Sequence, residues 1–566
     1  MAVALPRVTA TRHGWTGARA LAAYTAISVA FFGVRLLLYP GQTYVGFGSD
    51  GQIFIWAFAW WPHAILHGLN PFYTHAIWAP PGVNLTWTTS TPGLALAFAP
   101  VTWLAGPFVS YNAAAILMPA LAAWTAYLLC RHLTGSAWPS LAGGYLFGFS
   151  SYMLGQEEGH LHMTSVFLVP LAALLVVRNL EGEIGSRGLA LRLGPLLALQ
   201  VSFSTELAFT LTLALGVAIV LWIVFAPSAR RRLVALLAPL AAAYAVAGAL
   251  LAPFLYYLLT GFHRQAFQPP GIYVADLLNF VVPTRLEAVG AWWANGVANS
   301  FPGNNSERDA FLGPAVLAIV VLFVVRFRRT ARARVLLALL AVGFVAALGG
   351  ALFVDGHDTG VPLPWGHIGY WPLFDNTLPV RLTLFISLLV SVAVAIWSAA
   401  PGRLWPRVLL PVAAVLSLIP NPASHAWEAT ASVPAFFTSA RYRACLRPNE
   451  IVLPLPISGA GDEMAWQAAN GFRFRMAGGH ITAQEPAAFL HPASIAAIAD
   501  RNQPPVDPQV VLDYVRTEHV STILLDERVD WLWRPLLDRI APASELGGVL
   551  VYRVDGSGVR AGCPIA

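Results

Sequence analysis

The sequence predicts an all-α polytopic membrane protein that ends in a small α/β domain. Hydrophobic residues make up 57% of the 566 positions and charged residues only 11%, and the mean hydropathy is +0.62. Soluble domains carry about 25% charged residues, so a soluble globule of this size is excluded. The 12% aromatic content excludes a disordered chain. Near the C-terminus, short strand-like runs alternate with helical ones, which indicates the second domain.

The basic residues indicate how the chain is threaded. All 34 are Arg, and the net charge is +6. They occur in short clusters between apolar runs, as in loops held on the cytoplasmic side of a membrane. This distribution argues against a nucleic-acid partner. The clusters lie at 7–19, 131, 178–192, 230–232, 326–334 and 403–407.

The apolar runs then give the crossings. The run at 20–39 has the roughly 20 residues needed to cross a bilayer and is longer than the apolar part of a signal peptide. We expect a retained first helix with a cytoplasmic N-terminus. The segment 93–109 contains two Pro residues and suits an interfacial or re-entrant helix. About eleven crossings follow, near 20–39, 111–130, 138–154, 163–178, 192–204, 207–226, 233–259, 310–326, 335–353, 380–398 and 406–420.

An odd number of crossings places the C-terminal region outside the cytoplasm. We therefore predict a transmembrane domain over 1–420, with a large first outer loop at 40–110, and an extracytoplasmic α/β domain over 421–566. Cys445 and Cys563 fall in this second domain, where they either form a disulfide or stay independent thiols. The expected strands are 450–457, 521–526 and 547–554, and the expected helices are 485–499, 508–518 and 530–540.

Asp50 lies in the first outer loop, in the sequence "GSDG", where Ser49 precedes it and Gly51 follows it. It precedes an aromatic stretch, 53–66, that we expect to form an amphipathic helix. Trp56, Trp60 and Trp61 suit the headgroup region of a membrane. Asp50 is then either the N-cap of this helix or a catalytic carboxylate at the membrane surface, and the two roles are compatible.

A second candidate is "SSYMLGQEEGHLHM" at 150–163. Glu157, Glu158, His160 and His162 fall within six residues at the expected outer surface. Ionisable groups at membrane depth are costly and usually mark function. Carboxylates and imidazoles together bind a divalent metal or orient a phosphate and a general base. The alternative is a short loop that is polar because it is wet. The spacing matches no zinc motif.

Arg381, in "LPVRLTLF", lies where an apolar helix begins, at the face opposite to the cytoplasmic arginines. Its planar guanidinium suits a phosphate or carboxylate. The alternatives are an Arg that snorkels to the interface or one that pairs with Asp375. Arg264, Arg285 and Arg308 are weaker candidates of the same kind. Glu206 is expected to be a solvated turn residue.

His63 and His67 are four residues apart and would share a helix face. A metal site at these two residues is less favoured than the interpretation that both are solvated side chains at the membrane interface. The cofactor most consistent with the remaining residues is a divalent metal ion, with Asp50, Glu158 and His160 as ligands, although none is required.

The order of these features resembles the GT-C superfamily of polytopic glycosyltransferases, which includes protein O-mannosyltransferases and lipid A aminoarabinose transferases. The shared features are the acid soon after the first crossing (Asp50), the Pro-containing outer helix, the short polar loop "GQEEGHLHM", the late "LPVRLTLF" segment and an external C-terminal domain. The usual pair of adjacent acids in the first loop is absent here, since Ser49 and Gly51 flank Asp50.

The resemblance implies an enzyme in the bacterial inner membrane. It implies a polyprenyl-phosphate sugar as donor, an acceptor hydroxyl on an extracytoplasmic glycan, lipid or protein, and Asp50 as the base. Because the donor is already activated, no nucleotide loop is needed. Attack opposite the leaving phosphate would invert the anomeric centre. The alternatives are a transporter or flippase for a lipid-linked or anionic solute, although the sequence shows no convincing internal repeat, and a scaffold without chemistry.

Overall fold

The computed structural model describes residues 16–34, 36–261, 271–457, 459–481, 504–558, 560 and 562–564. The chain forms two compact units that do not follow its linear order. The first unit comprises 1–35, 114–252 and 266–427, and the second comprises 36–113, 253–265 and 428–566. The predicted first outer loop therefore belongs to the same unit as the C-terminal region. The domain division at 420/421 stays a prediction, and the helix expected at 485–499 lies outside the described residues.

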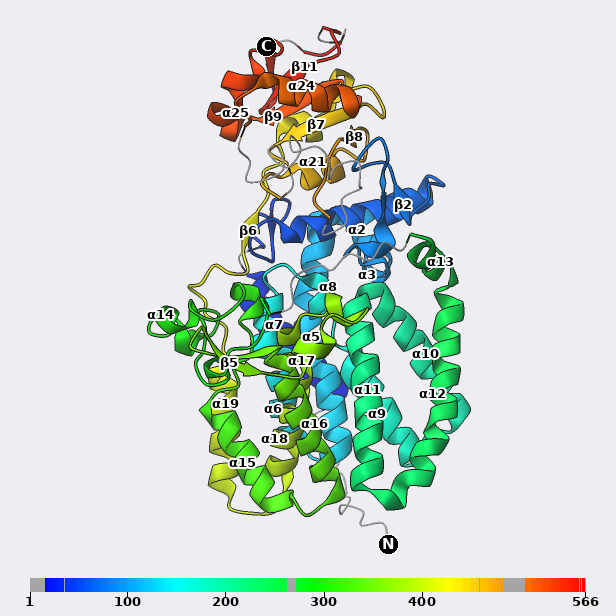
Figure 1. The fold of residues 1–566 in the computed structure, drawn as a ribbon, viewed down its shortest axis with the longest axis vertical. Helices are drawn as coiled ribbons and strands as arrows, with labels where there is room; N and C mark the ends of the chain where they lie inside the picture. The colour runs from blue at the N-terminus through cyan, green and yellow to red at the C-terminus, as the bar shows by residue number, and fades with distance from the viewer. Residues whose placement is uncertain are drawn as a thin grey trace. The chain divides into compact units, whose positions relative to one another are not determined.

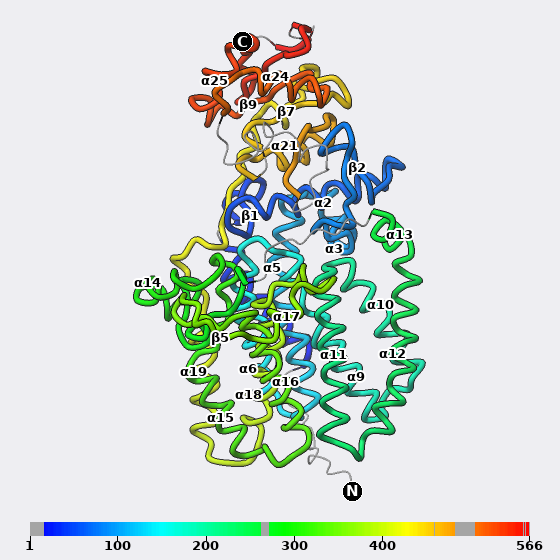
Figure 2. The backbone as a smooth tube through the Cα atoms, in the orientation of Figure 1, coloured from blue at the N-terminus to red at the C-terminus, as the bar shows by residue number. Residues whose placement is uncertain are grey.

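The first unit is built mainly of helices that run side by side (Figures 1 and 2). Helix α10 packs on α12, α11 and α18 both pack on α16, and α6 packs on α18. A short hairpin of β4 (Ala351–Val354) and β5 (His357–Pro362) precedes α18. The helices are α1 (Gly17–Ser28), most of α5 (Pro107–Thr134), α6 (Ala137–Gly148), α7 (Ser151–Gln156), α8 (Leu161–Thr164), α9 (Leu168–Leu180), α10 (Ser186–Phe203), α11 (Thr205–Phe225), α12 (Arg230–Leu250), α14 (Asn295–Ala298), α15 (Pro314–Phe327), α16 (Ala331–Ala347), α17 (Trp365–Ile368), α18 (Thr383–Ala399) and α19 (Leu404–Ser417).

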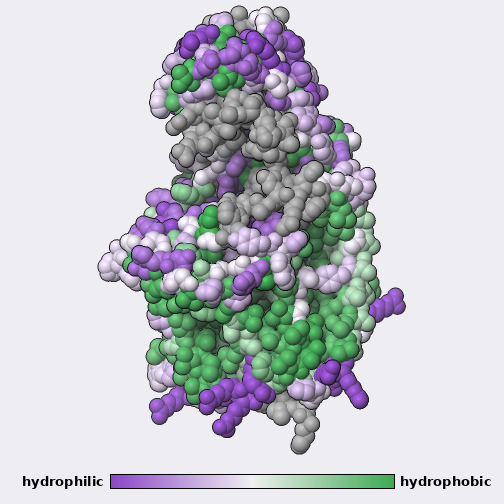
Figure 3. All heavy atoms as spheres, in the orientation of Figure 1, coloured by the Kyte–Doolittle hydropathy of each residue, from purple (hydrophilic) through white to green (hydrophobic). Residues whose placement is uncertain are grey.

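Helices long and apolar enough to cross a bilayer identify the chain as a multi-pass membrane protein. Within the described residues five helical segments qualify by length and composition, and the predicted number of about eleven stays a prediction. Exposed valines on α11 and α15 belong to the apolar outer face of the bundle, visible in Figure 3. Such a face is stable against lipid rather than water. The five segments are Pro107–Thr134, Leu161–Leu180, Thr205–Phe225, Pro227–Leu250 and Pro379–Ala399.

The Pro-containing segment at 93–109 does not form one continuous helix, and its interfacial or re-entrant position stays a prediction. It contains α3 (Pro92–Ala97) and α4 (Ala99–Ala105), and α5 begins at Pro107. Gly106, between α4 and α5, has a φ of +87°. That left-handed conformation favours glycine and breaks the helix at this point.

The second unit contains a five-stranded sheet with the strand order β10-β11-β9-β7-β8. Strands β7 (Ile451–Leu455), β8 (Arg475–Met476) and β9 (Thr522–Asp526) run parallel to one another. Strand β11 (Val549–Arg553) pairs antiparallel with β9, and β10 (Ala543–Leu546) pairs antiparallel with β11. The three strands predicted from apolar runs are thus present as β7, β9 and β11, and two predicted helices as α24 (Pro508–Thr517) and α25 (Asp530–Leu537). Cys445 and Cys563 form a disulfide.

Helix α2 (Asp50–Leu66) also belongs to the second unit and packs on α21 (Glu463–Ala469). The expectation of an amphipathic interfacial helix is wrong. Trp56, Trp60 and Trp61 are at most 4% exposed, and the Trp56 indole donates to Gln467 Oε1 at 2.6 Å. Protein rather than headgroups covers these rings, because α21, which follows β7, supplies both apolar contacts and a hydrogen-bond acceptor.

Candidate active site

Asp50 is the first residue of α2, and Ser49 occupies the N-cap position without a side-chain cap bond. The prediction that Asp50 caps the helix is therefore wrong. As an acid in the first turn, Asp50 still interacts favourably with the positive end of the helix dipole. Its side chain is 47% exposed, and its Oδ1 lies 3.3 Å from His480 Nε2. A carboxylate in this position can be reached by a substrate and is held by an imidazole.

Glu157 and Glu158 follow α7 and are buried, with exposures of 3% and 5%. The interpretation of this loop as polar because it is wet is therefore wrong. Burial raises the pKa of the Glu157 carboxyl well above its usual value, and Glu157 Oε1 has no hydrogen-bond partner among the described residues. Burial also raises the pKa of Glu158 to about 7, although the Arg285 charge opposes this shift. Both carboxyls thus hold protons to higher pH than a solvated glutamate.

Glu158 lies beside one guanidinium group, that of Arg285, which in turn acts on a second, that of Arg308. Arg285 Nη2 is 3.4 Å from Glu158 Oε1. Arg308 donates to the carbonyl oxygens of Phe301 and Gly303, each at 2.9 Å. Burial and the charge of Arg285 lower the pKa of Arg308, so the two guanidiniums act on each other. The acceptors of these two Arg308 bonds are carbonyl groups without net charge.

Arg381 is the cation of a buried ion-pair network. It lies 2.6 Å from Glu206 and 2.5 Å from Glu307, and its side chain is 10% exposed. The expectation that Glu206 is a solvated turn residue is wrong. The partner suggested by the sequence was Asp375, whereas the observed partners are Glu206 and Glu307. The reason is that Glu307, 74 positions earlier, is brought to the start of α18 by the fold.

The same network reaches the predicted polar loop. Gln156 Nε2 lies 3.3 Å from Glu307 and 3.2 Å from Asp309, and Gln156 Oε1 is 3.0 Å from His160 Nδ1. Burial and the neighbouring Glu307 raise the pKa of Asp309 well above its usual value. Thr383 donates to Asp309 at 3.0 Å. The structure thus brings His160 and Arg381, which lie in two separate sequence motifs, into one cluster.

Glycine at position 155 makes this cluster possible. A Cβ there would lie 2.5 Å from the Ser306 carbonyl oxygen and 3.1 Å from the Asp309 side chain. A larger residue would therefore push α7 away from 306–309 and separate Gln156 from its two carboxylate partners.

The remaining predicted residues are placed as follows. His63 and His67 stack with ring centroids 4.1 Å apart, and burial together with His67 lowers the pKa of His63. Arg264 lies outside the described residues. Asp50 belongs to the second unit, whereas Glu158 and Arg381 belong to the first. The sequence also predicts that Asp50, the glutamate–histidine loop and Arg381 meet in one cavity, and that stays a prediction.

Three residues of these sites, Glu307, Asp309 and His480, were not predicted from the sequence. Glu307 and Asp309 flank Arg308 in "NNSERDAF", and three consecutive charged residues just before a predicted crossing were a usable signal. His480, in "GGHIT", is 430 positions from Asp50. No local pattern connects the two, so only the fold could identify His480.

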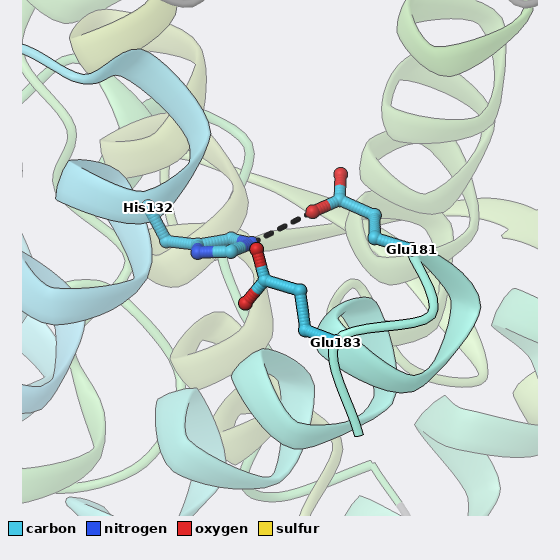
Figure 4. Close-up of side chains that lie close together, drawn as sticks. All are labelled: His132, Glu181 and Glu183. Carbon is cyan, nitrogen blue, oxygen red and sulfur yellow. Dashed lines mark hydrogen bonds and ion pairs between the residues drawn. The ribbon is translucent and has the colours of Figure 1, made fainter. Parts of the chain in front are cut away.

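From the sequence, Asp50, Glu158 and His160 were the candidate ligands of a divalent metal ion. Among the described residues, the only three-residue group with metal-like spacing is instead His132, Glu181 and Glu183 (Figure 4). His132 Nε2 is 2.9 Å from Glu181, and Arg332 and Arg178 pair with Glu181 and Glu183. Those arginines already compensate the acids, so the group is an ion-pair network. No metal-dependent step is derived at the predicted site.

The chain matches one family model, described as a domain of unknown function (DUF6311), over residues 21–419. The chain belongs to the DUF6311 family. This DUF6311 chain has no match among curated proteins, but solved structures share its fold. Arabinofuranosyltransferase AftD from Mycobacteria superposes over 95% of this chain with a TM-score of 0.59 and 15% identity.

The chain spans 40% of the length of AftD. Lower scores are found for the oligosaccharyltransferase of Archaeoglobus fulgidus (TM-score 0.49, 12% identity, 96% of this chain and 75% of that one). ArnT from Cupriavidus metallidurans, bound to undecaprenyl phosphate, gives a TM-score of 0.48 at 10% identity over 96% of this chain and 99% of that one. This DUF6311 member therefore shares the fold of AftD.

Proposed function

We propose that this chain is a membrane glycosyltransferase that moves a sugar from a polyprenyl-phosphate donor to an acceptor hydroxyl on the extracytoplasmic face, with inversion. The observation that carries the proposal is the half-exposed Asp50 carboxylate beside His480 in a GT-C fold. AftD, which shares the fold, is an arabinofuranosyltransferase. The Cys445–Cys563 disulfide supports an extracytoplasmic position for the second unit, because disulfides persist in oxidising compartments.

In the proposed reaction, Asp50 acts as the general base. The acceptor oxygen forms a bond to the anomeric carbon as the bond from that carbon to the phosphate oxygen breaks. The acceptor proton moves to Asp50, and the bonding electrons leave with the lipid phosphate. Positioned bases of this kind accelerate reactions by about 100- to 10,000-fold.

Developing negative charge on the phosphate needs a cation. Arg285 and Arg308 suit this role better than Arg381, because the Arg381 guanidinium is already bound by two carboxylates. A phosphate at Arg381 would have to displace one of them. The Arg308 hydrogen bonds to the carbonyl oxygens of Phe301 and Gly303 leave its charge available to an anion. Within the first unit, Arg285 and Arg308 are therefore the proposed anion-binding pair.

The experiment compares Asp50→Asn with Asp513→Asn in proteoliposomes that contain a radiolabelled polyprenyl-phosphate sugar and an acceptor. Asp513 lies on α24 of the same unit and is 61% exposed, so it controls for the general effect of an Asp-to-Asn change. We expect Asp50→Asn to lower transfer by about 100- to 10,000-fold and Asp513→Asn to leave it unchanged.

Two results would contradict the proposal. Full transfer by a folded Asp50→Asn protein would remove Asp50 as the base. Movement of unmodified lipid across the bilayer without a covalent product would favour the transporter.

A further inference from the structure

The pairing of Asp50 with His480 suggests a role for a residue that the sequence did not single out. We propose that His480 is a positioning residue for the base: its Nε2–H donates to Asp50 Oδ1 across 3.3 Å and orients the carboxylate for the acceptor hydroxyl. This inference rests on the proposed function. Because a carboxylate can only accept a hydrogen bond, His480 must carry its proton on Nε2.

Two contacts restrain His480, one at its imidazole and one at its backbone amide. Gly459 has a φ of +77°, and a Cβ there would lie 2.9 Å from His480 Cε1 and 3.0 Å from Ser49 Oγ. The backbone thus closes directly over the ring and over the residue before Asp50. The His480 amide points at Met464 Sδ, at 3.5 Å, near the start of α21. A loosely held surface histidine would not have such a fitted backbone around it.

The surrounding charges favour a donating imidazole. Glu463 is fully buried, and burial raises the pKa of its carboxyl while the charge of His480 opposes the shift. Asp462 is bound by Gln52 and by Arg528, each at 2.6 Å, so it is largely compensated. Tyr44 donates its hydroxyl to the Gly48 carbonyl. Asp50 and Glu463 are therefore the acids that act on His480.

During the reaction His480 gains and loses no proton. The acceptor proton goes to Asp50, and the bond to the lipid phosphate breaks as described above. The imidazole keeps its Nε2–H on Oδ1, which stabilises the charged base before the attack. Removing this donor both misorients the carboxylate and changes the pH at which it becomes charged, since a hydrogen bond to a charged form favours that form.

The test compares the full-length wild type with His480→Ala, His480→Gln and His75→Ala in the transfer assay. His75 is an exposed histidine of the same unit and serves as the matched control. We expect His480→Ala to lower kcat by about 10- to 100-fold, the range for hydrogen bonds to charged groups, with the donor KM unchanged. The acid limb of its pH–rate profile moves to higher pH. His480→Gln, which keeps an N–H donor, recovers most of kcat.

Two further variants make the result decisive. Asp50→Asn and the double variant Asp50→Asn with His480→Ala should be equally slow, because the imidazole acts only through the base. Unchanged kcat in His480→Ala, or a loss of kcat without any change in the pH profile, would overturn the inference. If the wild type transfers no sugar, the proposed function itself fails. If the wild type is active and only Asp50→Asn is impaired, only the role of His480 fails.

Discussion

Asp50 and the cluster around Arg381 show two ways in which this protein uses carboxylates. The Asp50 side chain is 47% exposed and lies at the end of a helix beside an imidazole. Glu307 is 2% exposed and is fixed by the Arg381 guanidinium. The first carboxylate can be reached by a substrate, whereas the second joins distant segments of one unit. Ionisable residues alone therefore do not mark the chemistry, and their exposure and partners separate the two roles.

Replacing Arg381 should give the largest effect on stability. In Arg381→Ala, Glu206 and Glu307 lose the cation that compensates them, and breaking a buried pair in this way costs about 3–5 kcal/mol. Thermal unfolding in detergent measures the loss. Arg516→Ala is the control, since Arg516 is 68% exposed in an (i, i+3) pair and exposed pairs contribute about 0–1 kcal/mol. Similar unfolding temperatures for the two variants would show that the network is not structural.

Glu158 should make stability depend on pH. Its pKa is raised from 4.5 to about 7, so the folded state binds a proton more tightly than the unfolded state. The contribution of Glu158 to stability is therefore fully present below pH 4.5 and is lost as pH rises through about 7, a change of about 3 kcal/mol at 1.36 kcal/mol per pKa unit. Glu158→Gln removes this part of the pH dependence.

The control for Glu158 is Glu545→Gln, at a 60% exposed position. Unfolding temperatures of both variants and the wild type are compared between pH 5 and pH 8. A Glu158→Gln protein with the same pH dependence as the wild type would contradict the assignment.

Arg308→Gln should weaken the donor site. Losing one charged hydrogen bond to phosphate lowers affinity by about 10-fold, which raises the donor KM in the transfer assay while folding is kept. Arg441→Gln, at an exposed position in the second unit, is the control. An unchanged KM would place the phosphate elsewhere.

Asp309→Asn should have the smallest effect. Burial and the neighbouring Glu307 raise the pKa of Asp309, so the site disfavours a charge there, and an amide of the same shape replaces the carboxyl without one. We expect a change within about 1 kcal/mol. Glu307→Gln, which removes a charged partner of Arg381, should be clearly worse, and the reverse order would show that Asp309 carries the charge.

The sequence by itself determined the membrane class and three strands of the sheet, and it predicted Asp50 as the candidate base. These follow from composition, from apolar periodicity over neighbouring residues and from the order of short motifs, all of which are local properties. Only the tertiary structure decided that Arg381 is bound by Glu206 and Glu307, that Trp56 is buried against Gln467 and that His480 lies beside Asp50. These pairs are separated by 74 to 430 positions, and chain segments so far apart are brought together by packing, which no local pattern records.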